Sequence, residues 1–226
     1  MQETPISFTV ERSNRKTIGL YVERDGSVLV RAPLTEALER IKAVVDAKRK
    51  WIYRAQARWA ALNPLQPGRE FVSGESVYLL GQPHRLDFRT EASRGVHKEG
   101  DLLVMRTDDK PRAEELLKSY FRAEGLMKLP ELVQQHARSM GLSPGTVRVQ
   151  ELGLRWGSCS DKGNLNFNWK AMAAPVEVLR YLVVHELAHL RHKNHSPQFW
   201  RVVEAEMPDW ARHAEWLTAH GAEMVL

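Results

Sequence analysis

The chain has 226 residues, of which 43% are hydrophobic and 27% charged, and its formal net charge is +5. This length suits one large domain or two small ones, and the apolar runs are much shorter than the ~18 residues of a membrane span, so we expect no membrane segment. The N-terminus lacks the apolar stretch of a secretory signal and Cys159 is the only cysteine, which favours a reducing, cytoplasmic location.

The first part of the chain shows strand patterns on either side of a helical one. Residues 6–10 alternate, and residues 17–22 and 27–30 flank Asp25-Gly26, a pair typical of hairpin turns. Apolar residues then recur at helical spacing over residues 35–62, and strand patterns return over residues 71–106. We therefore predict an antiparallel, β-rich N-terminal region over residues 1–110 that contains one long helix.

Residues 48–59, KRKWIYRAQARW, combine basic and aromatic side chains within that helix. Residues 1–110 hold 19 Lys and Arg against 15 Asp and Glu, so most of the positive excess lies in this region. Such a helix can contact nucleic acid. A solvated cationic face, with tryptophans anchored in the core behind it, explains the same pattern and is the commoner arrangement. We favour this second interpretation and keep nucleic acid as an alternative partner.

The second predicted region covers residues 111–226 and begins with a helical pattern to Met140, interrupted near Gly125 to Pro130. Further on, residues 161–163 predict a turn, and residues 164–169 alternate as in a hairpin strand. Leu165, Phe167 and Trp169 are expected to face the core, and Asn164, Asn166 and Asn168 to face away. The edge of such a hairpin can bind an extended peptide by backbone pairing, or it can be purely structural.

The most specific motif is His185-Glu186-Leu187-Ala188-His189, which reads HExxH. On a helix the two histidines lie ~40° apart around the axis and ~6 Å apart along it, so both imidazoles can bind one metal ion. Glu186 lies ~100° from His185, close to a metal-bound water but poorly placed as a ligand. This is the geometry of a helical zinc site with a neighbouring general base.

We expect His195 to be the third ligand. Ser196 and Pro197 suit the N-cap and first residue of a following helix, which leaves His195 in the turn before it, free to return toward the metal. His192 is a rival, but three ligands along one helix would approach the metal nearly in line. Glu204 and Glu206 are the remaining alternatives.

This ligand set predicts a Zn²⁺-dependent hydrolase, with a peptidase favoured and a peptide or protein as substrate. Three histidines leave one zinc position open to water, whose proton Glu186 takes and later delivers to the leaving amine. The candidate donors to the developing oxyanion are Tyr181, Arg155, His192 and Asn194. The candidate substrate-binding residues are Arg155, Trp156, Asn166, Tyr181 and His192.

Three other interpretations use the same residues. The zinc site can act on phosphorus, which makes the protein a nucleotide or phosphoester hydrolase, although no phosphate-binding glycine loop is evident. Zinc can instead have a structural role in a non-catalytic binding module, in which His192 or Cys159 supplies a fourth ligand. Cys159 as a nucleophile is disfavoured, because it needs a histidine that is not committed to metal.

Three stretches also resemble a known family. RWGSCS at residues 155–160, HELAHLRHKNHSPQFW at residues 185–200 and MPDW at residues 207–210 are similar to the YgjP-like metal-dependent hydrolases, relatives of the SprT and WLM metallopeptidases. The resemblance covers about residues 150–220. It implies an α+β, zincin-like fold whose active-site helix carries His185, Glu186 and His189, with His195 as the third ligand; the hairpin of residues 157–169 is expected beside that helix. The His195 spacing also equals that of metzincins, but His192 stands where metzincins have glycine, and no Met-turn is evident.

Overall fold

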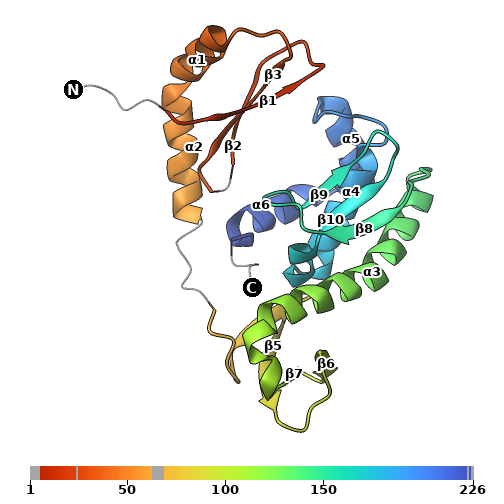
Figure 1. The fold of residues 1–226 in the computed structure, drawn as a ribbon. Helices are drawn as coiled ribbons and strands as arrows, with labels where there is room; N and C mark the ends of the chain where they lie inside the picture. Colours follow the sequence, from red (N-terminus) through yellow and green to blue (C-terminus); the bar gives the residue numbers. More distant parts are fainter. Residues whose placement is uncertain (1–5, 24, 63–68, 223, 225–226) are drawn as a thin grey trace. The chain divides into compact units, whose positions relative to one another are not determined.

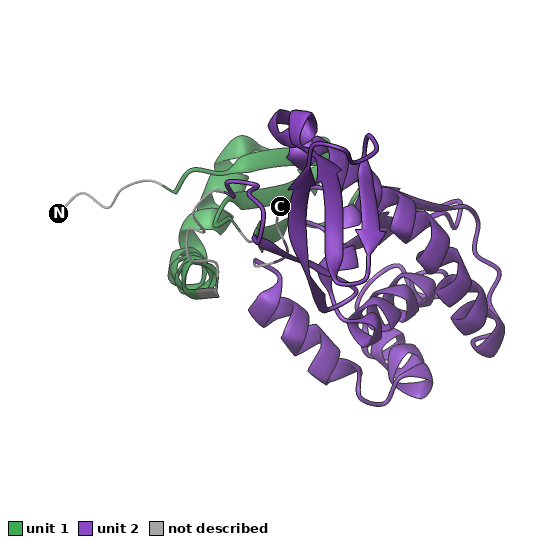
Figure 2. Cartoon of the chain, turned by 90° about the horizontal axis from the view of Figure 1, so that it is seen from below, with its two compact units in different colours: residues 1–66 green, residues 67–226 purple. Residues whose placement is uncertain are grey.

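The computed structural model describes residues 6–23, 25–62, 69–222 and 224, apart from the side chain of Leu62. The chain divides into two compact units, residues 1–66 and residues 67–226 (Figure 2). Both units combine helices with small sheets, so the expected α+β class is confirmed. Within the described ranges, no helix is long and apolar enough to cross a membrane.

The first unit packs two helices against a three-stranded sheet (Figure 1). Its strands are β1 (Thr9–Ser13), β2 (Gly19–Val22) and β3 (Val28–Pro33), in the order β1-β3-β2. β2 and β3 form the predicted hairpin, and Gly26 in its turn has φ 81°, a conformation that glycine adopts without strain. β1 pairs with β3 in parallel, which differs from the antiparallel pairing that we expected. β2 occupies one edge of β3 as its hairpin partner, so β1 pairs with the other edge.

The helix expected over residues 35–62 is two helices, α1 (Leu38–Ala47) and α2 (Arg49–Leu62). Between them Lys48 has φ −100° and ψ 9°, so the chain bends there without a glycine or proline to mark the place. Both helices place apolar residues against the sheet. The buried core of this unit consists of Val28, Val30, Ala32, Ile41, Val45 and Ile52.

The second unit begins with a four-stranded sheet. Its strands are β4 (Ser76–Leu79), β5 (Gln82–Arg89), β6 (Val96–Glu99) and β7 (Leu102–Arg106), in the order β4-β5-β7-β6, and β5 is parallel to β7. The predicted N-terminal region includes residues 67–110, whereas these strands contribute Val77, Leu86 and Leu103 to the core of the second unit. At the β4–β5 turn, the Leu80 amide donates to the Met172 carbonyl at 2.7 Å, which anchors the chain shortly before the HExxH helix.

A short 3-10 helix, η1 (Thr107–Arg112), leads into the long helix α3 (Ala113–Ser139). The interruption expected near Gly125 to Pro130 is absent, since α3 runs through both residues. A Cβ on Gly125 would lie 3.1 Å from Val149 and 3.3 Å from Met172, so glycine here allows α3 to pack closely against β8 (Val147–Gln150) and η2 (Trp169–Ala173).

β8 joins β9 (Gly157–Cys159) and β10 (Leu165–Asn168) in a second sheet of order β8-β10-β9. β9 and β10 form the predicted antiparallel hairpin, while β8 lies parallel to β10. The side chains of Leu165, Phe167 and Trp169 are buried, as expected. Because β10 is the central strand, β9 lies at an edge of this sheet.

Asn168 is the exception to the expected alternation, because its side chain is buried rather than facing away. Its Nδ2 donates to the carbonyls of Gly153 and Arg155 at 3.2 and 2.9 Å, and its Oδ1 accepts from the Lys170 amide at 3.2 Å. A buried amide with three partners costs little. Asn168 therefore holds the loop that enters β9.

Three helices complete the second unit: α4 (Val176–Ala188), α5 (Pro197–Glu206) and α6 (Trp210–His220). α4 carries the HExxH motif and contacts α3, α5, α6 and β9. Most of its side chains are buried, including Leu179, Val183 and Leu187. The motif therefore lies on a helix that is packed on several sides, which gives its side chains fixed positions.

Candidate metal centre

The three histidines of the motif come from the end of α4 and the turn that follows it. His185 lies in the last turn of α4, and His189 is the C-cap residue, whose φ of −66° and ψ of −15° keep it close to helical geometry. Ser196 caps α5, and its Oγ accepts from the Phe199 amide at 3.4 Å. The chain between the two helices thus returns His195 to the other two, as the Ser196-Pro197 pattern predicts.

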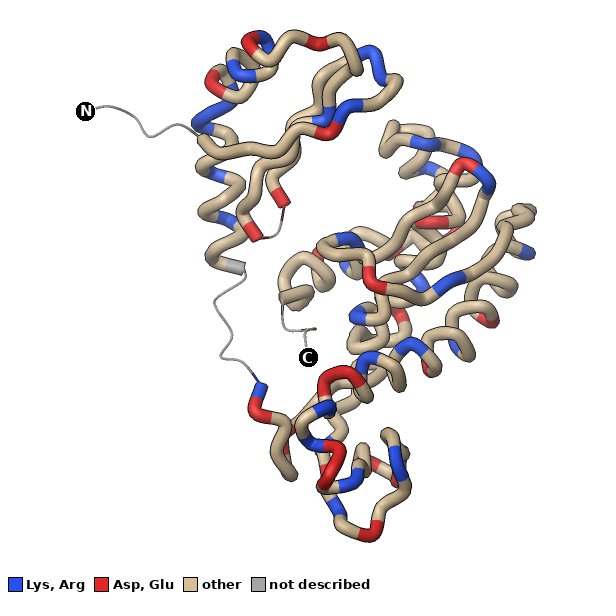
Figure 3. Tube along the Cα trace, viewed as in Figure 1, with Lys and Arg blue, Asp and Glu red and all other residues tan. Residues whose placement is uncertain are grey.

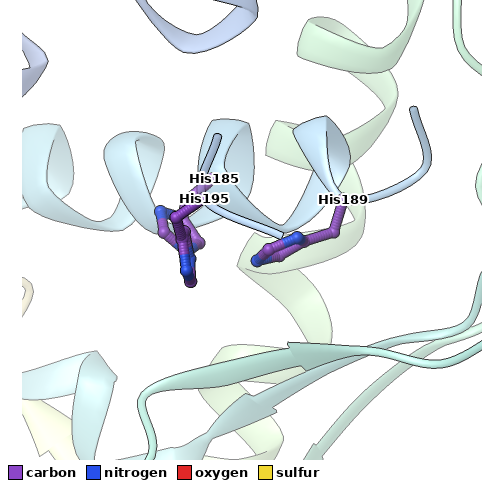
Figure 4. Close-up of side chains that lie close together, drawn as sticks. All are labelled: His185, His189 and His195. Carbon is purple, nitrogen blue, oxygen red and sulfur yellow. The ribbon is translucent and has the colours of Figure 1, made fainter. Parts of the chain in front are cut away.

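The imidazoles of His185, His189 and His195 converge on one side of α4 (Figure 4). One ring nitrogen from each lies within 4.8 Å of the others, and Nε2 of His195 is 3.0 Å from Nε2 of His185. Within the described ranges, this is the only group of three or more His, Cys, Asp or Glu side chains with spacing suited to a metal ion. It consists of nitrogen donors alone, the set that suits zinc and other borderline metals better than calcium or magnesium.

Neighbouring groups orient two of the rings. His189 Nδ1 lies 3.0 Å from the carbonyl of His192, so Nδ1 carries a proton to donate and Nε2 keeps a free lone pair. His185 Nδ1 lies 3.5 Å from the Tyr181 hydroxyl, one turn earlier on α4. Such partners fix the tautomer and direction of metal-binding imidazoles.

Glu186 follows His185 on α4, and its side chain is confined. Its side chain is 4% exposed, and Oε2 has no hydrogen-bond partner among the described residues. A Cβ on Gly157 of β9 would lie 2.5 Å from Oε1 of Glu186 and 2.8 Å from its Cδ. The backbone of this edge strand is therefore packed directly against the carboxylate, and only glycine at position 157 leaves room for the Glu186 side chain.

Burial disfavours the charged forms of Glu186 and of the three histidines. Burial raises the pKa of Glu186 to about 8, and the Arg155 charge opposes that rise. Burial and then the neighbouring His195 and His189 lower the pKa of His185 to about 3. Burial also lowers the pKa of His189 and of His195. The three imidazoles are thus neutral at pH 7, the form that binds metal.

The rival ligands lie in other arrangements. His192 contributes its carbonyl to His189 rather than its ring to the cluster. Oε1 and Oε2 of Glu206 contact His136 Nδ1 at 2.6 Å and Ser139 Oγ at 2.8 Å, and Glu204 is exposed on α5. The Cys159 thiol donates to the Ser160 carbonyl, and burial raises its pKa, which disfavours a reactive thiolate.

Three of the other candidate residues lie in the loop before β9, Arg155 and Trp156, or on β10, Asn166, and the fourth lies between α4 and α5. Arg155 is exposed, and its charge acts on Glu186. Trp156 is half-buried against the core. The amide of Asn166 donates to the Ser158 hydroxyl at 3.2 Å, which links β10 to β9. Asn194 is exposed in the turn before His195.

Two aromatic residues that were not predicted as part of the site, Phe199 and Trp200, pack against the histidines. Phe199 is fully buried, and its ring centroid lies 4.6 to 4.9 Å from those of all three histidines. Trp200 stacks on His195 at 5.7 Å between centroids. Their signal was present in the sequence, because both follow His195 within two turns of a capped helix.

Comparison with known proteins identifies the family of the chain. The YgjP-like pattern, described as a metallopeptidase domain, matches residues 16–220. The chain belongs to the YgjP-like metallopeptidase family. This membership confirms the resemblance seen in the sequence and makes the protein a metal-dependent peptidase by family.

Two solved structures are also similar to parts of this YgjP-like chain. The metallopeptidase zymogen abylysin of Pyrococcus abyssi is 26% identical, over 38% of this chain and 86% of its own, with a TM-score of 0.35. The metallopeptidase zymogen jannalysin of Methanocaldococcus jannaschii is 18% identical, over 40% of this chain and 93% of its own, with a TM-score of 0.37. Among curated proteins, no match to this chain is found.

Proposed function

We propose that this YgjP-like protein is a zinc peptidase in which His185, His189 and His195 bind the metal and Glu186 is the general base. The observation that carries the proposal is the convergence of three imidazole nitrogens, together with a buried carboxylate on the residue after His185, whose Oε2 has no hydrogen-bond partner among the described residues. A buried, unpartnered carboxylate is costly, so an observed one calls for a functional explanation.

The residues fit a zinc ion. All three donors are imidazoles whose pKa values are lowered by burial, and neighbouring imidazoles lower those of His185 and His195 further. Three protein ligands are the usual number in catalytic zinc sites, where the remaining position takes water or substrate. The carboxyl of Glu186, whose pKa burial raises to about 8, needs a nearby positive charge to stay ionised at neutral pH.

When bound, zinc supplies a charge that polarises the scissile carbonyl and lowers the pKa of coordinated water toward 7. Glu186 accepts the proton of the attacking water on its unpartnered Oε2 and passes it to the nitrogen of the leaving amine. Gly157 keeps the carboxylate in place by lying against Oε1. Phe199 packs behind the three imidazoles and excludes water from that side.

The substrate is an extended peptide that pairs with the edge of β9. This strand is paired on one side only in the described sheet, and its first residue touches the general base. A peptide backbone added along β9 would bring a carbonyl next to Glu186. Arg155, whose charge acts on Glu186, and Tyr181, whose hydroxyl lies 3.5 Å from His185 Nδ1, are the candidate donors to the oxyanion.

The test compares wild type with Glu186→Gln in metal content and turnover. The amide keeps the size of the side chain but cannot accept the proton, so we expect about one zinc per chain in both and a loss of hydrolysis of at least ~100-fold. Unstructured protein, peptide mixtures and nucleoside triphosphates are assayed in parallel. Retained hydrolysis by the variant removes Glu186 from the mechanism, and turnover confined to the nucleotides rejects the peptidase.

A further inference from the structure

The first unit has a groove that the peptidase site does not use. It has a volume of about 520 Å³ and lies between the edge strand β2 and helix α2. Its polar and aromatic lining consists of Tyr21, Glu23, Trp51, Arg54, Arg58 and Trp59. All residues that line the groove belong to the first unit, residues 1–66.

The charge of the protein is concentrated in this unit. Residues 1–66 contain 12 Lys and Arg against 7 Asp and Glu, an excess of five, whereas residues 67–226 contain 21 of each. The whole net charge of +5 therefore belongs to the first unit. Along α2, Lys and Arg recur without any acidic residue, as Figure 3 shows. Such a surface attracts polyanions over a distance of about a Debye length.

Arg54 and Arg58 contribute positive charge to the lining of the groove. They lie one helical turn apart on α2, both are exposed, and neither has an ion pair or hydrogen bond with any described residue. Two like charges at this spacing slightly destabilise a helix. Elsewhere in the same unit Arg31 and Arg49 pair with Glu11 and Asp46. The two unpaired guanidinium groups are therefore available to bind an external anion.

Flat aromatic surfaces lie beside these cations. Trp51 is 47% exposed and Tyr21 is 40% exposed, although their apolar rings would gain from burial. The guanidinium of Arg31 lies 5.1 Å from the centroid of the Tyr21 ring and orients it. Exposed aromatic faces next to unpaired cations match the two needs of single-stranded nucleic acid, since bases stack and phosphates require positive charge.

The groove is poorly suited to a peptide added as a strand. Trp59 Nε1 donates to the Val22 carbonyl at 3.1 Å, so α2 already occupies a backbone acceptor at the edge of β2. Strand addition relies on such acceptors. A ligand that uses side-chain faces and charge, rather than backbone pairing, is therefore favoured over an acidic peptide.

We propose that the groove between β2 and α2 binds single-stranded nucleic acid without sequence preference. Bases stack on Trp51 and Tyr21, and phosphates lie against Arg54 and Arg58. This binding is independent of the metal centre, and it makes the first unit a recruiting surface for a nucleic acid.

The test measures fluorescence anisotropy of labelled oligodeoxythymidylate about 15 nucleotides long, titrated with the full-length protein at several salt concentrations. The groove variants are Trp51→Ala and the double reversal Arg54→Glu/Arg58→Glu. The matched control is Lys16→Glu/Lys42→Glu, which makes the same charge change at exposed residues that do not line the groove. Inorganic polyphosphate, polyglutamate and duplex DNA serve as competitors, and thermal melting shows that each variant is folded.

We expect salt-dependent binding, weakened about tenfold by Trp51→Ala because stacking is worth 1–3 kcal/mol per base. The arginine reversal should lower the affinity further and flatten the slope of log K against log salt by about 1.4, which is ~0.7 for each of the two phosphates that the arginines neutralise. The lysine reversal should have a much smaller effect. Absence of binding at low salt, equal weakening in the control, competition by polyphosphate as strong as by the oligonucleotide, or a preference for duplex would each overturn the proposal.

Discussion

Gly157→Ala is the sharpest perturbation of the proposed centre, because it adds one methyl group against the general base. The new Cβ would lie 2.5 Å from Oε1 of Glu186 and 2.8 Å from both Cγ and Cδ. Favourable contacts between such atoms begin near ~3.5 Å, so the carboxylate must move by about 1 Å. Gly157 does not have a positive φ, so its backbone accepts alanine and the contact alone opposes it.

A displacement of about 1 Å at a reacting group costs on the order of 100-fold in rate. We therefore expect kcat/KM to fall about 100-fold, or about 2.7 kcal/mol of transition-state stabilisation, with overpacking costing about 1–3 kcal/mol of folding free energy. Zinc content should remain near one per chain, because the three closest atoms to the new Cβ belong to Glu186, which is not a proposed ligand. The assay measures kcat/KM on a peptide substrate together with metal content and the midpoint of urea unfolding.

The control is Ser158→Ala on the same strand, which removes a hydroxyl but adds no atom near Glu186. A second background separates steric displacement from general damage to β9. Glu186→Asp withdraws the carboxylate by one methylene, so Gly157→Ala should cost much less in that background than in wild type. Unchanged kcat/KM in Gly157→Ala, or the same loss in both backgrounds, would refute this reasoning.

Three further predictions concern the metal and its support. His195→Ala should weaken zinc binding more than about 100-fold, whereas His192→Ala should leave it within about threefold, as measured by competition with a chromophoric chelator; equal effects would contradict the ligand assignment. Tyr181→Phe should weaken zinc binding about tenfold, because it removes the hydroxyl near His185 Nδ1. An unchanged zinc affinity would show that this 3.5 Å contact does not support metal binding. Asn168→Ala should lower the free energy of unfolding by about 2 kcal/mol, because two carbonyls and one amide lose their hydrogen-bond partner. Urea denaturation measures this change, and a value under about 0.5 kcal/mol would indicate that water replaces the lost side chain.

The convergence of the three histidines could be predicted because it rests on local rules. An α-helix brings residues four apart onto one face, and a Ser-Pro pair marks the start of the next helix, so the path of the chain from His189 to His195 was largely determined. The β9–β10 hairpin and the burial of Phe167 followed in the same way from alternation and a turn.

Features that depend on distant parts of the chain could not be predicted. The contact of Gly157 with Glu186 joins two segments about thirty residues apart, and no local pattern encodes it. Asn168 broke the alternation because a loop fifteen residues earlier supplies its hydrogen-bond partners. The bend at Lys48 leaves the apolar period almost intact, so the pattern of α1 and α2 reads as one helix.

The third histidine lies beyond α4, whose last turn carries His185 and whose C-cap residue is His189. His195 precedes the cap of α5, so a zinc ion bound by all three residues would tie α5 to α4 as a removable cross-link. Part of the binding free energy would then become resistance of α5 to local opening. Amide hydrogen exchange along α5 would accordingly rise and fall with the free zinc concentration, while the buried middle of α4 would exchange slowly in either state.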